Sequence, residues 1–415
     1  MRFTDLLTAV RAVVPMIAAL AIGAFAISLV PPHDLGPRWL VIVLAVVAVI
    51  WVVARPLGDR RDDVLPAITI LLTSIGIIAI ARVDPTLASR QLLWLSIALV
   101  LAIALGPALR RYRFLARYKY VWILASILLF VFVAIFGQEV NGAKLWIRVG
   151  PIQFEPIEAI KLFVVLFMAA YLAETADVIA AAKPWSLRAN AKYLGPLFIG
   201  WGTSVGILVF ERDLGTAALL LGIFAAMLYV ATRRFDLIVG SVGVFAIAAW
   251  WAVHHYSYVA LRIASWRHPF TDPYGSGYQS LQSLFALGAG GLFGTGYGLG
   301  RPDYIPAVAT DYIYAAFSEE FGALGGIAVC ALFLVLVLRG LAIAVEKRDL
   351  YGRLVATGLA ATLGMQVFVI VGGVLHLFPL TGITLPFFSY GGSSLVANYV
   401  LIAFLWALSA RPKLA

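Results

Sequence analysis

Three acidic side chains stand just ahead of a long apolar segment and have the types and spacing that acid–base chemistry needs. Asp311 lies among aromatic residues in the stretch IPAVATDYIYAAFSEEFG, and Glu319 and Glu320 lead directly into the apolar run. A carboxylate beside a binding site can take a proton from an attacking hydroxyl group. The alternative is structural, because Asp311 could equally serve as the N-cap of a helix that starts at Tyr312.

Two further segments place charged side chains at the start of apolar runs. In FEPIEAIKL, Glu158 and Lys161 are three residues apart, so they share a helix face and can pair, and Pro156 predicts the helix start. An ammonium group inside a bilayer needs a partner or a wet cavity, so the pair either pins the helix end or belongs to a polar site. In FERDLGTA, Asp213 is placed to cap a helix that begins at Leu214.

The segment 254–320 is a long predicted loop. Loops of this length are uncommon in compact proteins and are usually functional. The segment contains Arg262 and Arg267, which can present a fork of donors to a phosphate group. Its glycine-rich stretch LGAGGLFGTGYGLG (287–300) is not followed by Lys-Ser or Lys-Thr, so nucleotide binding is disfavoured. We expect instead a re-entrant, closely packed or mobile loop.

The elements that must position these residues are membrane helices. The chain has 415 residues, of which 62% are hydrophobic and 13% charged, so we predict an all-α polytopic membrane protein with about twelve transmembrane helices. The apolar runs are 14–30, 39–54, 65–81, 92–109, 121–136, 159–175, 194–210, 214–231, 237–253, 321–338, 354–373 and 394–409. On this count, the segment 254–320 is a long extracellular loop between helices nine and ten.

The distribution of charge predicts the orientation of these spans. Most Lys and Arg residues fall in loops that share a side with both termini, so the positive-inside rule places both termini in the cytoplasm. This asymmetry explains the pI of about 9.7 without nucleic-acid binding. The acidic residues crowd where external loops meet helix ends. Such a distribution favours chemistry on a lipid headgroup over transport, for which ionisable groups near the midplane are typical.

Other site classes are disfavoured. The five histidines lack the spacing of a zinc site, and no Walker sequence suggests an ATP-driven pump. Cys330 is the single cysteine, so no intramolecular disulfide can form.

Five ordered motifs resemble those of the SEDS family, the RodA, FtsW and SpoVE group of bacterial cell-wall polymerases. They are GAKLWIRVG with FEPIEAIKL, DLGTA, GYQSLQS, TDYIYAAFSEEFG and PLTGITLPFFSYGGSSL. The resemblance covers about residues 65–410. It implies a ten-helix polymerase core in residues 61–415, with residues 1–60 as an added N-terminal pair of helices. Departures from the family pattern, such as Ile157 and His376, leave the RodA, FtsW or SpoVE subtype open.

The resemblance implies an enzyme of the bacterial cytoplasmic membrane that serves cell shape, elongation or division. Members polymerise lipid II, a disaccharide-peptide on undecaprenyl pyrophosphate, into peptidoglycan at the outer face. Asp311 matches the family's essential aspartate, which implies a general base in an inverting glycosyl transfer. Pyrophosphate is a good leaving group, so no second carboxylic acid is required.

The resemblance also implies roles for the other motif residues. Lys161 and Arg262 would contact the headgroup or pyrophosphate, with Glu158 orienting Lys161. Asp213, Glu319 and Glu320 would shape the site or hold a cation. The remaining substrate-binding candidates in the motifs are Gln279, Gln282, Ser283 and Ser389.

Cofactors and partners follow from the same resemblance. No cofactor is certain, and a divalent cation, Mg²⁺ or Mn²⁺, stays open. The expected partners are lipid II, membrane lipids and a class B penicillin-binding protein transpeptidase. Two other functions remain as alternatives: a lipid II flippase or transporter, and a non-catalytic scaffold for a partner enzyme.

Overall fold

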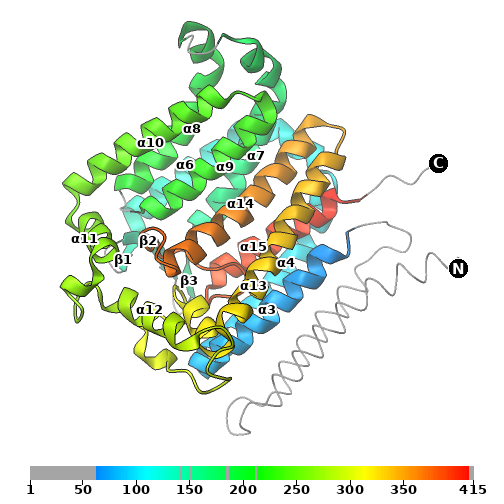
Figure 1. Ribbon diagram of the computed structural model, residues 1–415. Coiled ribbons are helices and arrows are strands. Elements are labelled where there is room, and N and C mark those ends of the chain that lie inside the picture. Colours follow the sequence, from blue (N-terminus) through cyan, green and yellow to red (C-terminus); the bar gives the residue numbers. More distant parts are fainter. Residues whose placement is uncertain (1–61, 141–142, 150–151, 184–186, 211–212, 411–415) are drawn as a thin grey trace, which may run out of the picture. The chain divides into compact units, whose positions relative to one another are not determined.

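The described part of the chain is built almost entirely from α-helices. The computed structural model describes residues 62–140, 143–149, 152–183, 187–210 and 213–410 (Figure 1). Its helices are α3 (Val64–Val83), α4 (Pro85–Arg110), α5 (Tyr112–Leu115), α6 (Lys119–Phe136), α7 (Ile157–Ala181), α8 (Leu187–Phe210), α9 (Leu214–Thr232), α10 (Phe235–His255), α11 (Ser257–Arg267), α12 (Tyr278–Gly290), α13 (Ile313–Glu346), α14 (Leu350–Val374) and α15 (Gly392–Leu408). Short 3₁₀ helices are η1 (Ala116–Tyr118), η2 (Pro269–Thr271) and η3 (Pro302–Tyr304).

The prediction of an all-α polytopic membrane protein is confirmed. Within the described residues, eight helical segments are long and apolar enough to cross a membrane: α3, α4, the run from α5 to α6, α7, α9, α10, α13 and α14. Two further predicted spans, 194–210 and 394–409, coincide with α8 and with the shorter apolar helix α15. The predicted spans 14–30 and 39–54, and with them the predicted domain 1–60, lie outside the described residues.

The predicted external loop 254–320 is largely structured. It contains α11 and α12 and the 3₁₀ helices η2 and η3. Further upstream, three short antiparallel strands follow α6, with β2 (Ala143–Val149) between β1 (Gln138–Val140) and β3 (Ile152–Phe154). This sheet was not predicted, although the alternation of apolar and polar residues in AKLWIRV is the usual signal of a strand.

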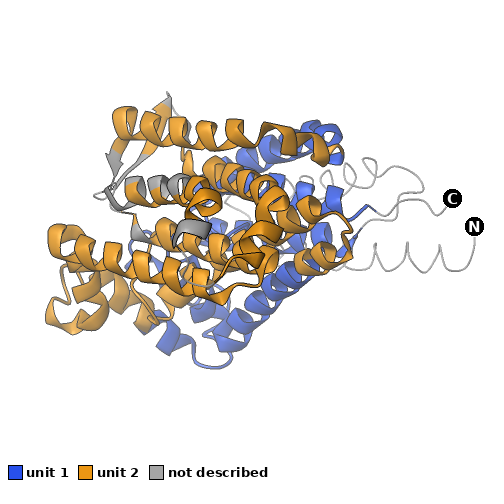
Figure 2. Ribbon diagram, turned by 90° about the horizontal axis from the view of Figure 1, so that it is seen from above, with its two compact units in different colours: residues 1–110, 285–339, 384–415 blue, residues 111–284, 340–383 orange. Residues whose placement is uncertain are grey.

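The chain divides into two compact units, each assembled from separate stretches of sequence (Figure 2). Unit 1 takes its described residues from the ranges 1–110, 285–339 and 384–415, and unit 2 from 111–284 and 340–383. In unit 1, α15 packs along α4 and against α3. In unit 2, α14 packs against both α7 and α9.

A small residue permits the close packing in unit 2. A Cβ atom at Gly358 of α14 would lie 2.6 Å from a side-chain carbon of Val165 in α7 and 2.7 Å from the sulfur of Met227 in α9. Small residues at helix contacts let membrane helices approach closely, which compensates for the weak hydrophobic drive between helices in lipid.

In unit 2, polar side chains near the ends of several helices contact one another. The Tyr112 hydroxyl donates to an Asp349 carboxylate oxygen at 2.8 Å, joining the turn before α6 to the start of α14. Lys119, at the start of α6, pairs with Glu174 near the end of α7. These turns were predicted to share the basic side of the membrane, and within unit 2 the structure places them together.

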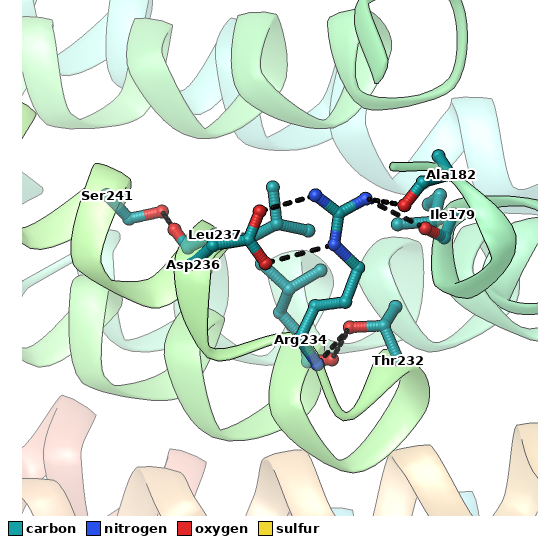
Figure 3. Close-up of polar contacts among 8 residues, drawn as sticks. Ile179, Ala182, Thr232, Arg234, Asp236, Leu237 and Ser241 are labelled. Carbon is teal, nitrogen blue, oxygen red and sulfur yellow. Dashed lines mark hydrogen bonds and ion pairs between the residues drawn. The ribbon is translucent and has the colours of Figure 1, made fainter. Parts of the chain in front are cut away.

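Arg234 closes the C-terminal end of α7 (Figure 3). Its side chain is buried, and one guanidinium nitrogen donates to the carbonyl oxygens of Ile179 and Ala182 at 3.0 and 3.1 Å. Two other nitrogens bind the Asp236 carboxylate, with Nε 3.0 Å from Oδ1. The last carbonyl groups of a helix have no partner within it, so this arginine supplies donors that α7 itself lacks.

We expect Asp236→Asn to destabilise the protein strongly. Removing one partner of a buried ion pair leaves the other charge uncompensated, at a cost of about 3–5 kcal/mol. The change should lower the midpoint of thermal unfolding in detergent, followed by tryptophan fluorescence. Arg113→Ala is the control, because Arg113 is 74% exposed in its pair with Asp349 and should change the midpoint little. Equal shifts for the two variants would contradict a structural role for the Arg234 pair.

Candidate active site

The predicted site residues divide between the two units, and we describe each group by itself. Unit 1 holds Asp311, Glu319, Glu320 and Ser389, and unit 2 holds Glu158, Lys161, Asp213, Arg262, Gln279, Gln282 and Ser283.

Asp311 lies half-buried in a turn just ahead of α13. The helix begins at Ile313, and the carbonyl oxygen of Tyr312 accepts its first hydrogen bond, from the N–H of Ala315 at 2.9 Å. The helix therefore starts one residue later than an N-cap at Asp311 requires. The N–H of Asp311 donates to the carbonyl oxygen of Ala307 at 3.0 Å, and Ala307 has a left-handed backbone, with φ of 52°. A non-glycine residue in this conformation is uncommon and strained.

Ser389 belongs to a buried non-helical segment, residues 384–391, that precedes α15. The backbone N–H of Leu385 donates to the Ser389 hydroxyl at 3.0 Å, and the Ser389 N–H donates back to the Leu385 carbonyl oxygen at 2.9 Å. Pro379, Pro386 and Gly391 fall in the break between α14 and α15, and α15 begins at Gly392. The hydroxyl of Ser389 serves the turn, and its contact with substrate stays a prediction.

Glu319 and Glu320 lie at a break within α13. Gly322 interrupts the helix with φ of 70° and ψ of −177°, a conformation essentially restricted to glycine. The glycine-rich loop 287–300 pairs with the broken backbone on both sides. Its hydrogen bonds are Thr295 N to Glu319 O (2.9 Å), Gly296 N to Glu320 O (3.0 Å), Ala323 N to Gly291 O (2.9 Å) and Leu324 N to Leu292 O (3.2 Å). Of the three expectations for this loop, close packing is the one observed.

The two glutamate side chains hold the same loop. Glu320 is 5% exposed and pairs with Arg82 at 3.0 Å, and Arg82 also donates to the carbonyl oxygen of Gly298 at 3.1 Å. Glu319 is 7% exposed and accepts the N–H of Arg301 at 3.1 Å. Across the described residues, no group of three or more His, Cys, Asp or Glu side chains is placed to hold a metal. A divalent cation at these glutamates stays a prediction.

In unit 2, Glu158 and Lys161 form a buried ion pair at 2.8 Å. The Lys161 ammonium also donates to the side-chain oxygen of Gln366 in α14, at 3.2 Å. All three side chains are almost completely buried. Gln366 was not predicted, although a single glutamine inside a long apolar run was a signal that could have drawn attention to it. The pair thus pins α7 to α14, and a substrate contact by Lys161 stays a prediction.

Asp213 caps α9, as the sequence predicted. One carboxylate oxygen accepts the Thr216 N–H at 3.0 Å, and the other accepts the Thr216 hydroxyl. Burial raises the pKa of the Asp213 carboxyl, although the Thr216 hydrogen bonds and the charge of Arg262 lower it in part. Arg262 is only partly buried; it donates to the Thr381 carbonyl oxygen at 3.3 Å and lies over the Tyr258 ring, 4.6 Å from its centre. Of Lys161 and Arg262, the two residues expected to contact the pyrophosphate, Arg262 is the more accessible.

The remaining candidates lie on α12. Gln279 is exposed and Gln282 half-buried, whereas Ser283 is 1% exposed. Within the described part of the chain, the Ser283 hydroxyl has no hydrogen-bond partner. Because positions three and four apart share a helix face, these side chains can act together, and their contact with substrate stays a prediction.

Three comparisons with known proteins all point to the same family. Residues 63–413 match the profile of a family of cell cycle proteins named for FtsW, RodA and SpoVE. The chain is 39% identical to the peptidoglycan glycosyltransferase RodA of Mycobacterium tuberculosis strain H37Rv, over 86% of this chain and 79% of that protein. It is 35% identical to stage V sporulation protein E of Bacillus subtilis strain 168, over 84% and 96%. A solved peptidoglycan synthase complex contains a chain with a TM-score of 0.68 and 28% identity, over 85% and 98%.

We expect Gly322→Ala to prevent normal folding. A Cβ atom there would lie 2.4 Å from the Gly294 nitrogen and the Leu292 oxygen, and φ would remain positive. Clash and strain together should cost at least about 3 kcal/mol. The yield of monodisperse protein on size exclusion measures the effect. Gly288→Ala is the control, because nothing lies within 4 Å of that Cβ position and alanine favours a helix by about 0.5–1 kcal/mol. Normal yield for Gly322→Ala would contradict the loop–helix pairing described here.

We expect Asp213→Asn to stabilise the protein at neutral pH. The raised pKa of Asp213 means that ionisation opposes folding, so this penalty grows as pH rises above the ordinary pKa of an aspartate, about 3.8, and vanishes well below it. The asparagine oxygen can still accept the Thr216 N–H. The thermal midpoint should therefore rise by about a few degrees at pH 7, with a smaller gain at pH 4.5. A gain that is larger at the lower pH would show that burial is not the cause.

Proposed function

We propose that this chain, which belongs to the FtsW, RodA and SpoVE family, is a peptidoglycan glycosyltransferase that polymerises lipid II at the outer face of the bacterial cytoplasmic membrane. The family profile covers residues 63–413. The observation that carries the proposal is Asp311, a half-buried carboxylate in the sequence TDY, which resembles a motif of this family, held in a strained turn at the start of α13. The protein is a multi-pass membrane protein, and its substrate is an amphiphile of the same membrane.

Asp311 acts as the general base. A sugar hydroxyl of the acceptor attacks the anomeric carbon of the donor, and the carboxylate takes the hydroxyl proton as the new C–O bond forms. The bond from that carbon to undecaprenyl pyrophosphate breaks on the opposite side, so the configuration inverts. The departing pyrophosphate needs no proton from a second carboxylic acid.

The departing diphosphate requires positive charge near it. Arg262 supports this role because it is partly exposed and its guanidinium group can bind two phosphate oxygens at once. Lys161 is committed to Glu158 and Gln366, so its contribution to the diphosphate is electrostatic and at longer range. Asp213 shapes this region through the cap of α9, and a divalent cation stays an alternative source of the positive charge.

Orientation and partnership complete the proposal. Both termini lie in the cytoplasm, as the excess of Lys and Arg in the corresponding loops supports, which leaves Asp311 on the outer side. The similarity to a chain of a peptidoglycan synthase complex supports a partner, which we take to be a class B penicillin-binding protein that cross-links the new strand.

We expect Asp311→Asn to abolish glycan synthesis. Loss of the base should lower the rate of polymerisation by about 100-fold or more, while the thermal midpoint stays near that of the wild type. The assay uses purified protein in liposomes with labelled lipid II and resolves glycan strands on gels. Asp303→Asn is the matched control, because Asp303 is an exposed acid of the same segment, in η3.

Two results would contradict the proposal. Polymerisation by Asp311→Asn at the wild-type rate would remove the base assignment. Wild-type protein that moves lipid II across the liposome membrane without making glycan would identify a transporter.

A further inference from the structure

Hydrogen bonds link Gln91 of α4 to the turn that carries Asp311, although the two residues are far apart in sequence. We propose that Gln91 of α4 is a positioning residue for Asp311. Gln91 is 1% exposed, and it acts through the buried segment 384–391. The proposal deepens the function proposed above and rests on it.

Gln91 holds the segment through both ends of its amide group. The Nε2 atom donates to the Ser389 carbonyl oxygen at 3.2 Å, and the Oε1 atom accepts the Gly391 N–H at 3.3 Å. Tyr390, between them, donates its N–H to the carbonyl oxygen of Ala309 at 2.8 Å. Ala309 is two residues before Asp311. A continuous set of hydrogen bonds therefore runs from α4 through the segment to the turn that carries the carboxylate.

Strained backbone lies on both sides of the Tyr390–Ala309 hydrogen bond. Phe387 has φ of 64° and Ala307 has φ of 52°. A bulky residue with positive φ persists only when its surroundings over-determine it, and such residues cluster at functional sites. Without the ties that hold them, both residues would relax to ordinary conformations, and Asp311 would shift with its turn.

Packing holds the segment 384–391 in place but does not supply the hydrogen bonds that Gln91 makes to it. A Cβ atom at Gly76 of α3 would lie 2.6 Å from the Phe388 Cα, and one at Gly392 would lie 2.2 Å from the Trp94 ring. These contacts press the segment against α3 and α4 but satisfy none of its polar groups. In an apolar environment, the Ser389 carbonyl and the Gly391 N–H both need partners. An amide supplies an acceptor and a donor together, which a carboxylate or an aliphatic side chain does not.

The kinetic test compares Gln91→Leu and Gln91→Glu with Thr69→Val in the lipid II assay. Thr69 is an equally buried polar residue of unit 1, whose hydroxyl donates to the Leu65 carbonyl oxygen of its own helix at 2.8 Å. Both Gln91 variants should lower kcat by about 10- to 100-fold, as small displacements of a catalytic group do, with KM within about 2-fold. Thr69→Val should keep the wild-type kcat. Equal losses in kcat for all three variants would overturn the proposal, because they would reflect general destabilisation.

A second readout does not depend on activity. In a Cys330→Ala background, Thr310→Cys places a single thiol beside Asp311, and its rate of labelling by a maleimide reports the mobility of the turn. Gln91→Glu should raise that rate several-fold, and Thr69→Val should leave it unchanged. An unchanged rate in the Gln91 variant would overturn the proposal even if wild-type protein polymerises lipid II. If the wild type makes no glycan, the proposed function fails while the labelling still tests the tie between Gln91 and the turn.

Discussion

Backbone that leaves the helical ladder inside a membrane must find its hydrogen bonds within the protein, and this requirement organises the part of unit 1 that carries Asp311. At Gly322 the break in α13 is completed by the glycine-rich loop, whose own backbone groups are satisfied by the same bonds. In the segment 384–391, the hydroxyl of Ser389 and the amide of Gln91 supply hydrogen bonds to the non-helical backbone. The turn at Asp311 leads into α13 and is hydrogen-bonded to the segment 384–391 through Ala309, so its geometry depends on how both breaks are closed.

The acidic residues that looked alike in sequence have different environments in the structure. Glu158, Glu319 and Glu320 are buried and have cationic or backbone partners, and Asp213 caps a helix. Each of them therefore stabilises a particular packing. Asp311 is half-buried and stands in a turn with strained backbone. Exposure, rather than residue type, separates the candidate base from its neighbours.

The sequence predicted those features that depend on local pattern. Apolar runs located the membrane-length helices of the described residues, and Pro156 and Asp213 marked helix starts. Features that depend on partners distant in sequence were missed. Nothing local to Gln91 or Gln366 indicates what it binds, because a lone amide in an apolar helix becomes informative only when the fold brings a partner to it. The glycine-rich loop was ambiguous for the same reason, since its glycines fit a broken helix that lies elsewhere in the chain.

This distribution of partners has a physical logic for an enzyme that acts on an amphiphile. Every polar group near the bilayer carries a desolvation cost, so charges without a fixed partner are expensive there. A carboxylate at such a site needs rigid backbone around it if it is to act as a base. Rigidity matters because proton transfer depends on the position of the base within a fraction of an ångström. Buried amides suit this task, since they tie polar backbone in place without adding a charge that would alter the field at the base.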